Sequence, residues 1–207
     1  MPVFLKDGRS VLFIHIPKTG GSTIEKLFRR AGWAQKFRET RKSHPHVFPL
    51  RRCSPQHHHG ALLSELFDVS RFDSVFLVTR DPLSRFRSEY IMRHTTSPRT
   101  DAASVAAWHD KQFAKYAANP YHLDNHLRPQ HEFLVPGARV FRLEDSLEAA
   151  VATLNEEHDL KLPTELPHAL NSQKRSGVSS SAVELSPEVE ASLRATYAED
   201  FRKFGYA

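Results

Sequence analysis

Residues 11–28 read VLFIHIPKTGGSTIEKLF and join an apolar run, a glycine-containing turn and a helical pattern. The run Val11–Ile16 is apolar rather than alternating, which is typical of a strand buried in a parallel sheet. After the turn, apolar residues recur at helical spacing and stop before Gly32, so the spacing predicts a helix that ends there. These residues are Ile24, Leu27, Phe28 and Ala31. The stretch therefore predicts a strand–turn–helix unit of an α/β protein.

The turn between the strand and the helix has the composition of an anion-binding site. Gly20 and Gly21 favour a tight turn, and the helix N-terminus that follows adds about half a positive charge and several backbone N–H groups. Lys18 contributes a full cation, and Ser22 and Thr23 contribute hydroxyl donors. We therefore expect this turn to bind a phosphate group.

The order of residues in this turn differs from that of the common nucleotide-binding loop. The Walker pattern G-x-x-x-x-G-K-[ST] places its lysine after the last glycine, whereas Lys18 precedes both glycines. No glycine stands at the start of the loop, where residues 14–17 read IHIP. A P-loop kinase or NTPase that uses ATP with Mg²⁺ stays open as an alternative, but this order of residues counts against it.

An acidic pair, Glu144 and Asp145, follows a predicted strand of residues 139–143 and precedes a predicted helix of residues 146–157. An acidic pair after a strand could form the Walker B metal site of an NTPase. We interpret this pair first as the entrance of the helix, and Glu144 could also orient a catalytic or substrate group.

A further predicted strand, residues 74–79, delivers Arg80 at its carboxyl end. Ligands of open α/β sheets bind at the carboxyl ends of the strands, and a guanidinium group suits a phosphate dianion. Asp81 and Pro82 are typical of the N-cap and first residue of a helix, which predicts that a helix begins directly after Arg80. An ion pair between Arg80 and Asp81 is the structural alternative.

The remaining apolar patterns predict a short strand at residues 33–37, a helix that begins near Ala61 and a helix at residues 102–118. A last helix is expected because apolar residues repeat every four positions near the C-terminus. These residues are Val189, Leu193, Tyr197 and Phe201. We see no internal repeat and expect a single domain of residues 1–207.

Three segments resemble a known family. HIPKTGGST at residues 15–23 is similar to the 5′-phosphosulfate loop of the carbohydrate-type sulfotransferases (sulfotransferase family 2), which include heparan sulfate 2-O- and chondroitin sulfotransferases. RDPLSRFRSEY at residues 80–90 resembles their 3′-phosphate motif, and YAEDFRKFGY at residues 197–206 resembles their C-terminal pattern. The resemblance implies an α/β, P-loop-type three-layer fold with a central parallel sheet flanked by helices.

The same resemblance implies the donor 3′-phosphoadenosine 5′-phosphosulfate (PAPS), which leaves as 3′,5′-bisphosphoadenosine. Arg80 and Ser88 are then expected to hold the 3′-phosphate. In the serine-rich loop at residues 171–187, Lys174 and Arg175 are further candidates for that phosphate, and a solvated charged loop is the alternative. The residues expected at the 5′-phosphosulfate are Lys18, Thr19, Gly20, Gly21, Ser22 and Thr23, of which Lys18 also stabilises the leaving group.

Three adjacent histidines, His57, His58 and His59, lie between the two phosphate motifs. Consecutive positions cannot all face one metal ion, and the chain offers no partner at ligand spacing, so we expect no metal. In an extended segment His57 and His59 would share a side. The heparan sulfate 2-O-sulfotransferases carry a His-Gly-His segment in the comparable interval, which implies a catalytic base here. We expect His59 in this role, with His57 second, and solvated surface histidines are the alternative.

The segment DNHLRPQ at residues 124–130 resembles a His-Trp-x-Pro-Gln stretch of chondroitin-type relatives, with Leu127 in place of the tryptophan. His126, Arg128 and Gln130 are therefore candidates for the acceptor side, and packing of the loop is an equal alternative. The resemblance implies a hydroxyl-bearing acceptor such as a glycan or glycoconjugate.

Charge is unevenly distributed along the chain. Residues 1–60 hold 12 Lys/Arg against 3 Asp/Glu, a net charge of +9, and the remainder carries −4. This asymmetry suits a polyanionic cofactor or acceptor, and a non-catalytic module that binds sulfated or phosphorylated polyanions is a further alternative. No recognition-helix pattern points to nucleic acid. The chain shows no signal peptide and no membrane span, and it has a lone Cys53, so we expect a cytoplasmic protein.

Overall fold

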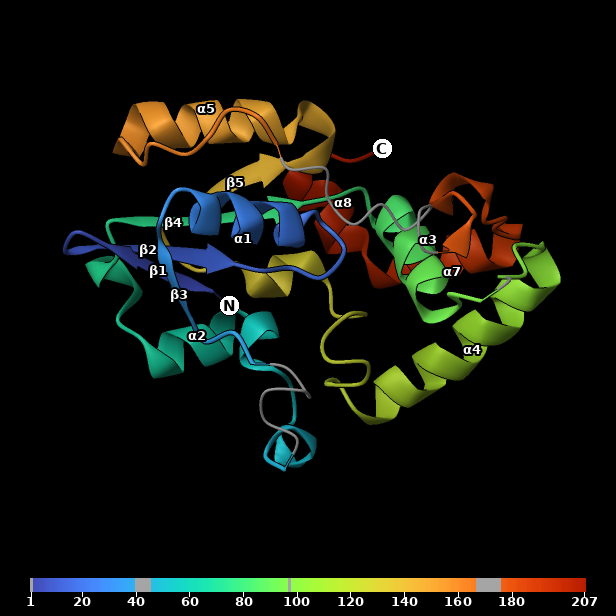
Figure 1. Cartoon of the computed structure of the whole chain (residues 1–207). Helices are drawn as coiled ribbons and strands as arrows, with labels where there is room; N and C mark the ends of the chain where they lie inside the picture. The colour runs from blue at the N-terminus through green and yellow to red at the C-terminus, as the bar shows by residue number, and fades with distance from the viewer. Residues whose placement is uncertain (1, 40–45, 97, 167–175) are drawn as a thin grey trace. The chain divides into compact units, whose positions relative to one another are not determined.

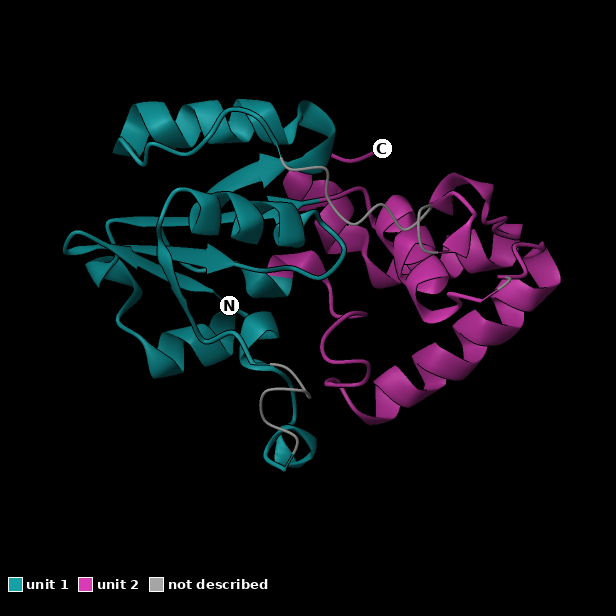
Figure 2. Cartoon of the chain, viewed as in Figure 1, with its two compact units in different colours: residues 1–79, 132–169 teal, residues 80–131, 170–207 magenta. Residues whose placement is uncertain are grey.

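The computed structural model describes residues 2–39, 46–96, 98–166 and 176–207. The chain divides into two compact units, coloured separately in Figure 2: unit 1 comprises residues 1–79 and 132–169, and unit 2 comprises residues 80–131 and 170–207. Lys174 and Arg175 lie outside the described residues.

Unit 1 is built on a five-stranded sheet in the order β3-β1-β2-β4-β5 (Figure 1). Strands β2, β4 and β5 pair in parallel, as expected, whereas β1 pairs antiparallel with both β2 and β3. The fold class is therefore α/β with a mostly parallel sheet. The strands are β1 (Val3–Lys6), β2 (Arg9–Ile14), β3 (Ala34–Lys36), β4 (Ser74–Thr79) and β5 (Arg139–Arg142).

The antiparallel strand β1 departs from the expectation of an all-parallel sheet. It joins β2 through a two-residue turn, because Lys6 pairs with Arg9. Asp7 and Gly8 in this turn have φ values of 50° and 75°. An Asp-Gly pair with two positive φ values is the preferred connection of a β-hairpin, since its twist matches that of the strands. The short hairpin adds β1 as a fourth strand beside the three parallel ones, and β3 pairs with β1 as the fifth.

Helices cover both faces of the sheet in unit 1 (Figure 1). The helices α1 (Gly21–Arg30) and α5 (Leu147–His158) lie on one face, and α2 (Gly60–Leu66) lies on the other. Neighbouring strand residues point to opposite faces, so Phe13 packs with the α1 and α5 side chains while Leu12 packs with Leu63 of α2. Unit 1 thus has three layers, and its designation as P-loop-type stays a prediction.

The helix α1 ends where the sequence predicts. Gly32 has a φ of 80°, its N–H donates to the Arg29 carbonyl, and the N–H of Trp33 donates to the Phe28 carbonyl. This pair of bonds is the Schellman motif, which satisfies the last carbonyl groups of a helix and requires a left-handed residue that glycine supplies without strain.

Unit 2 is helical. Its long elements are α3 (Pro82–Arg93), α4 (Ala102–Ala118), α7 (Pro187–Thr196) and α8 (Ala198–Phe204). Its apolar core joins α3, α4 and α7 through side chains such as Phe86, Val105 and Leu193. None of the helices in the described part of the chain is both long and apolar enough to cross a bilayer.

The expectation of one continuous C-terminal helix is wrong. The helix breaks at Tyr197, whose φ of −106° and ψ of 20° separate α7 from α8. The ring of Tyr197 is buried, and its hydroxyl donates to the carbonyl oxygen of Leu127 at 2.8 Å. The tertiary hydrogen bond accompanies the departure from helical geometry, and a four-residue apolar repeat cannot reveal it.

Candidate functional site

The turn at residues 18–20 leads from β2 to the N-terminus of α1. Lys18 has a φ of 72°, and Gly20, the N-cap residue of α1, has a φ of 87°. No side chain caps this helix, and its first turn carries no acidic residue. Each other described helix of ten or more residues is capped by a side-chain oxygen, from Asp81, Asp101, Ser146 and Ser186 in turn. The first N–H groups of α1 are therefore suited to an anion from outside the chain.

The side chains of the turn divide into internal and accessible ones. Thr19 is buried, and its hydroxyl donates to the Ile16 carbonyl at 2.9 Å, so this side chain closes the turn itself. Thr23 is also buried. Lys18 is half-buried and Ser22 is exposed, which makes these two the side chains of the turn that a ligand can reach.

A buried histidine–glutamate pair lies beneath the turn. Nδ1 of His15 is 2.8 Å from Oε1 of Glu25, and both residues are buried. Burial alone would raise the pKa of the Glu25 carboxyl, but the hydrogen bond and charge of His15, together with Gln35 and Arg38, lower this pKa to about 2. An ionised carboxylate can only accept hydrogen bonds, so Nδ1 of His15 carries the hydrogen.

The other ring nitrogen of His15 lies against the end of the turn at residues 18–20, which we name the phosphate turn after its expected ligand. An ideal Cβ placed on Gly21 would overlap Nε2 of His15 and the neighbouring ring carbons. The ring of His15 also meets that of His57 edge-on, with 5.3 Å between centroids. Glu25 therefore holds a histidine whose ring contacts both the first residue of α1 and His57, one of the two candidate base residues.

The histidine segment is not extended throughout, because Pro55–His57 forms a 3-10 turn. His58 and His59 are extended, and His59 is the N-cap residue of α2. Strand alternation therefore does not decide which histidine faces the phosphate turn. The ring contact with His15 links His57 to that turn.

In unit 2 the residues after β4 adopt the expected helix start. Asp81 is the N-cap residue of α3 and accepts a hydrogen bond from the Ser84 N–H at 2.7 Å. Arg80 is half-buried, and Ser88 lies on the helix with 7% of its surface exposed. Arg85, in contrast, is buried and donates to the carbonyl oxygens of the loop that follows α4, which is a structural role.

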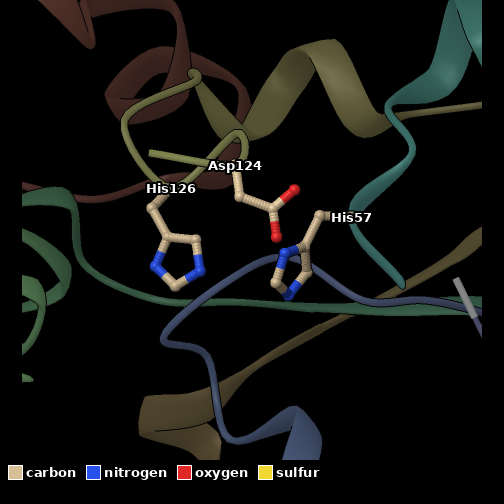
Figure 3. A group of neighbouring side chains, drawn as sticks. All are labelled: His57, Asp124 and His126. Carbon is tan, nitrogen blue, oxygen red and sulfur yellow. The ribbon is translucent and has the colours of Figure 1, made fainter. Parts of the chain in front are cut away.

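The loop after α4 carries the side chains of Asp124 and His126, shown in Figure 3. Nδ1 of His126 lies 2.6 Å from Oε2 of Glu89. Burial raises the pKa of Glu89, but His126 and Arg93 outweigh it and lower the pKa to about 2. Arg128 is buried and donates to Asn125 at 3.0 Å. These contacts favour loop packing over an acceptor role for His126 and Arg128.

The acidic pair after β5 lies at a helix entrance, as interpreted. Glu144 and Asp145 are exposed, and Ser146, which follows them, caps α5 by accepting hydrogen bonds from two backbone N–H groups. No sequence pattern assigned a role to two other acidic residues, Glu25 and Asp200. Both are buried side chains within helices, α1 and α8, and their partners lie 10 and 70 residues away, so no local spacing signals them. Asp200 lies in the C-terminal segment that resembles the family, and this resemblance was the only sequence signal that could have pointed to it.

Comparison with known proteins yields one match. A model of the sulfotransferase family (sulfotransferase family 2) matches residues 1–207. Neither the curated proteins nor the solved structures gave a match. The family match spans the phosphate turn, the histidine segment and Arg80 alike, so the chain belongs to the sulfotransferase family over its whole length and is an enzyme.

Proposed function

We propose that this sulfotransferase moves the sulfuryl group of PAPS to a hydroxyl of a carbohydrate acceptor. The observation that carries the proposal is the α1 N-terminus, which has no capping side chain and no acidic residue and is preceded by Lys18. PAPS supplies an activated sulfuryl group on its 5′-phosphate. The donor set of the turn fits such a group, because it combines a cation, a hydroxyl and oriented backbone N–H groups.

Lys18 and the N–H groups of the turn stabilise the negative charge that develops on the bridging oxygen as the bisphosphate leaves. Preorganised donors of this kind contribute several kcal/mol to catalysis because they need no reorganisation during the reaction. Ser22 is exposed and adds a hydroxyl. The remaining residues of the turn contribute backbone N–H groups and its shape: Thr19, Gly20, Gly21 and Thr23.

Arg80 and Ser88 are proposed to bind the 3′-phosphate of the same nucleotide. The support is that both phosphate motifs directly follow neighbouring parallel strands: Ile14, the last residue of β2, pairs with Leu77 of β4. Carboxyl ends of adjacent parallel strands share one edge of the sheet, where ligands of α/β folds bind. The resemblance adds Lys174 and Arg175 to this proposal.

A histidine of the segment 57–59 is proposed to take the proton of the acceptor hydroxyl. An ordinary imidazole suits general base catalysis near neutral pH. The sequence resemblance favours His59, while the ring contact with His15 favours His57. We propose His57 as the first of the two to test.

The test has two parts. Calorimetry with 3′,5′-bisphosphoadenosine, AMP and ATP–Mg²⁺ should show the bisphosphate binding tightest; equal or tighter binding of ATP–Mg²⁺ would favour a kinase and overturn the proposal. A screen with ³⁵S-labelled PAPS against desulfated heparan, chondroitin and simple sugars should then label a carbohydrate. Binding of heparin without release of bisphosphate from PAPS in any acceptor reaction would indicate a polyanion-binding module instead.

A further inference from the structure

Two segments of unit 2 have no part in the proposed chemistry: the end of the loop after α4, and α8. Hydrogen bonds join the end of the loop to the backbone of Arg80, and α8 to the end of the loop. The chain of contacts begins at Arg80, passes through Gln130 and ends at Asp200, all within unit 2.

Arg80 stands between two regular elements, since β4 ends at Thr79 and α3 begins at Pro82. Its N–H and C=O groups need partners outside the strand and the helix. Gln130 provides both: the N–H of Arg80 donates to Oε1 at 2.9 Å, and Nε2 donates to the carbonyl oxygen of Arg80 at 2.7 Å. A primary amide side chain carries an acceptor oxygen and a donor nitrogen on one carbon, so it can accept from the N–H and donate to the C=O at the same time.

Gln130 is itself fixed from α8. Its side chain is fully buried, and its backbone N–H donates to Oδ2 of Asp200 at 2.7 Å. Asp200 is also fully buried and accepts from both the backbone N–H and Nδ1 of His131 at 2.8 Å. Three hydrogen bonds to one carboxylate therefore hold the backbone from which the Gln130 side chain extends.

The carbonyl groups just before Gln130 are fixed as well. Arg85 donates to the carbonyl oxygens of His126 and Arg128 at 2.8 and 2.9 Å, and Tyr197 donates to that of Leu127. A shift of this loop would break buried hydrogen bonds, each of which is costly to leave unmade. The loop is thus a rigid support rather than a free surface.

We propose that Gln130 and Asp200 are positioning residues for Arg80 and thereby set the enzyme's preference for nucleotides that carry a 3′-phosphate. The inference rests on the proposed function, in which Arg80 binds that phosphate. Paired hydrogen bonds to the N–H and C=O of one residue fix the direction of its Cα–Cβ bond. Because the guanidinium lies at the far end of a long side chain, a small rotation of this backbone displaces it from a bidentate geometry.

The test compares the affinities of the full chain for 3′,5′-bisphosphoadenosine and for AMP, which lacks the 3′-phosphate, by calorimetry. Gln130→Met keeps the length of the side chain and removes both hydrogen bonds to Arg80. We expect the Kd for the bisphosphate to rise about tenfold and the Kd for AMP to stay unchanged. A merely structural role would weaken both nucleotides alike or neither.

Gln112 offers a matched control. It is a second buried glutamine of unit 2, and its Oε1 lies 2.8 Å from His122 rather than near Arg80. Gln112→Met should keep the ratio of the two affinities even if the melting temperature falls. A changed ratio of affinities in this variant would show that any substitution of a buried glutamine in unit 2 alters nucleotide preference, and would overturn the proposal.

A double-mutant cycle with Arg80→Ala tests the route of the effect. Gln130→Met should cause no further loss of bisphosphate affinity once the Arg80 side chain is absent; an undiminished tenfold loss in that background would overturn the inference. Asp200→Asn should shift the ratio in the same direction by less, and it replaces Gln130→Met should that variant fail to fold. If the wild type prefers 3′,5′-bisphosphoadenosine to AMP and the variants keep the same ratio of affinities, the inference alone is wrong. If the wild type does not prefer the bisphosphate, the proposed function is wrong as well.

Discussion

Nε2 of His15 occupies the space that a Cβ atom on Gly21 would need. The backbone of Gly21 itself does not lie in the left-handed region. Glycine is thus required here by the neighbouring imidazole rather than by its own φ value. The phosphate turn and the buried His15–Glu25 pair form one packed unit.

We expect Gly21→Ala to lower the free energy of unfolding by about 1–3 kcal/mol, the usual cost of overpacking, and to impair binding of 3′,5′-bisphosphoadenosine. The reason is that the new methyl group must displace the His15 ring or the start of α1. Urea unfolding and calorimetry measure the two effects.

Two further variants check this explanation. Gly137→Ala serves as a control, since a Cβ there meets no atom within 4 Å. Its only cost is the strain of an alanine at a φ of 76°. In a His15→Ala background, Gly21→Ala should cost much less because the obstructing ring is gone. Equal costs in the two backgrounds would show that the clash does not arise from His15.

Glu25 predicts a specific dependence of stability on pH. Its pKa is about 2 in the folded chain against an ordinary value of 4.5. A lowered pKa stabilises the fold above pH 4.5, and this stabilisation, about 3 kcal/mol at most, is lost as the pH falls from 4.5 toward 2. Glu25→Gln should therefore be less stable than the wild type at pH 6 and should lose less stability between pH 5 and pH 3.

Urea unfolding at a series of pH values measures this dependence. Glu65→Gln, an exposed position on α2, controls for the loss of one carboxyl group. Glu89 also has a pKa of about 2, so its contribution to the free energy of unfolding is lost over the same pH range. The Glu25 variant should therefore keep part of the dependence of stability on pH. A slope identical to that of the wild type would contradict the account of the buried pair.

The histidine segment predicts a loss of turnover without loss of donor binding. His57→Ala should lower kcat by about 10²–10⁴-fold, the usual contribution of a general base, with an unchanged Kd for 3′,5′-bisphosphoadenosine. His58→Ala is the neighbouring control. If His59→Ala shows the loss instead, the base is His59, and full activity in both variants would assign the proton transfer to another group.

The two phosphate motifs should differ in their kinetic signatures. Lys18→Ala should lower kcat because it removes a charge that acts on the leaving group, and Arg80→Ala should mainly raise the KM for PAPS, each by about ten- to a hundredfold. Arg87→Ala is the matched control, since this α3 arginine donates to the carbonyl of Val183. An Arg80→Ala enzyme with an unchanged KM for PAPS would remove Arg80 from the nucleotide site.

Local patterns predicted most of the regular elements. The strand at residues 74–79 and the helix at residues 102–118 have the expected bounds, because each is a long apolar or amphipathic pattern with clear end signals. The strand β1 has only four residues, and its Asp-Gly turn is its main signal. The helix break at Tyr197 was not predicted, because the apolar repeat continues through this residue and its hydrogen bond to Leu127 is a tertiary contact.

The sequence predicted the motifs of the candidate site but not the contacts that hold them in place. Lys18, the glycines and Arg80 follow from strand ends, helix starts and the chemistry of anions. The pairing of His15 with Glu25 and of Gln130 with Arg80 could not be predicted, because these contacts bridge 10 and 50 residues and depend on the packing of whole elements. Residues proposed to bind could be named from the sequence, while the residues that hold them in place required the three-dimensional structure.

Neither compact unit is a continuous stretch of chain, since each is made of two separate segments. On the ribosome, the apolar core that packs β2 and α1 is complete once α5 and Leu162 have emerged, so unit 1 can assemble before α8 is made. Asp200 follows Gln130 by 70 residues, and the support of Arg80 is completed only after α8 has been synthesised. A nascent chain would therefore complete the turn at residues 18–20 before it completes the support of the Arg80 backbone.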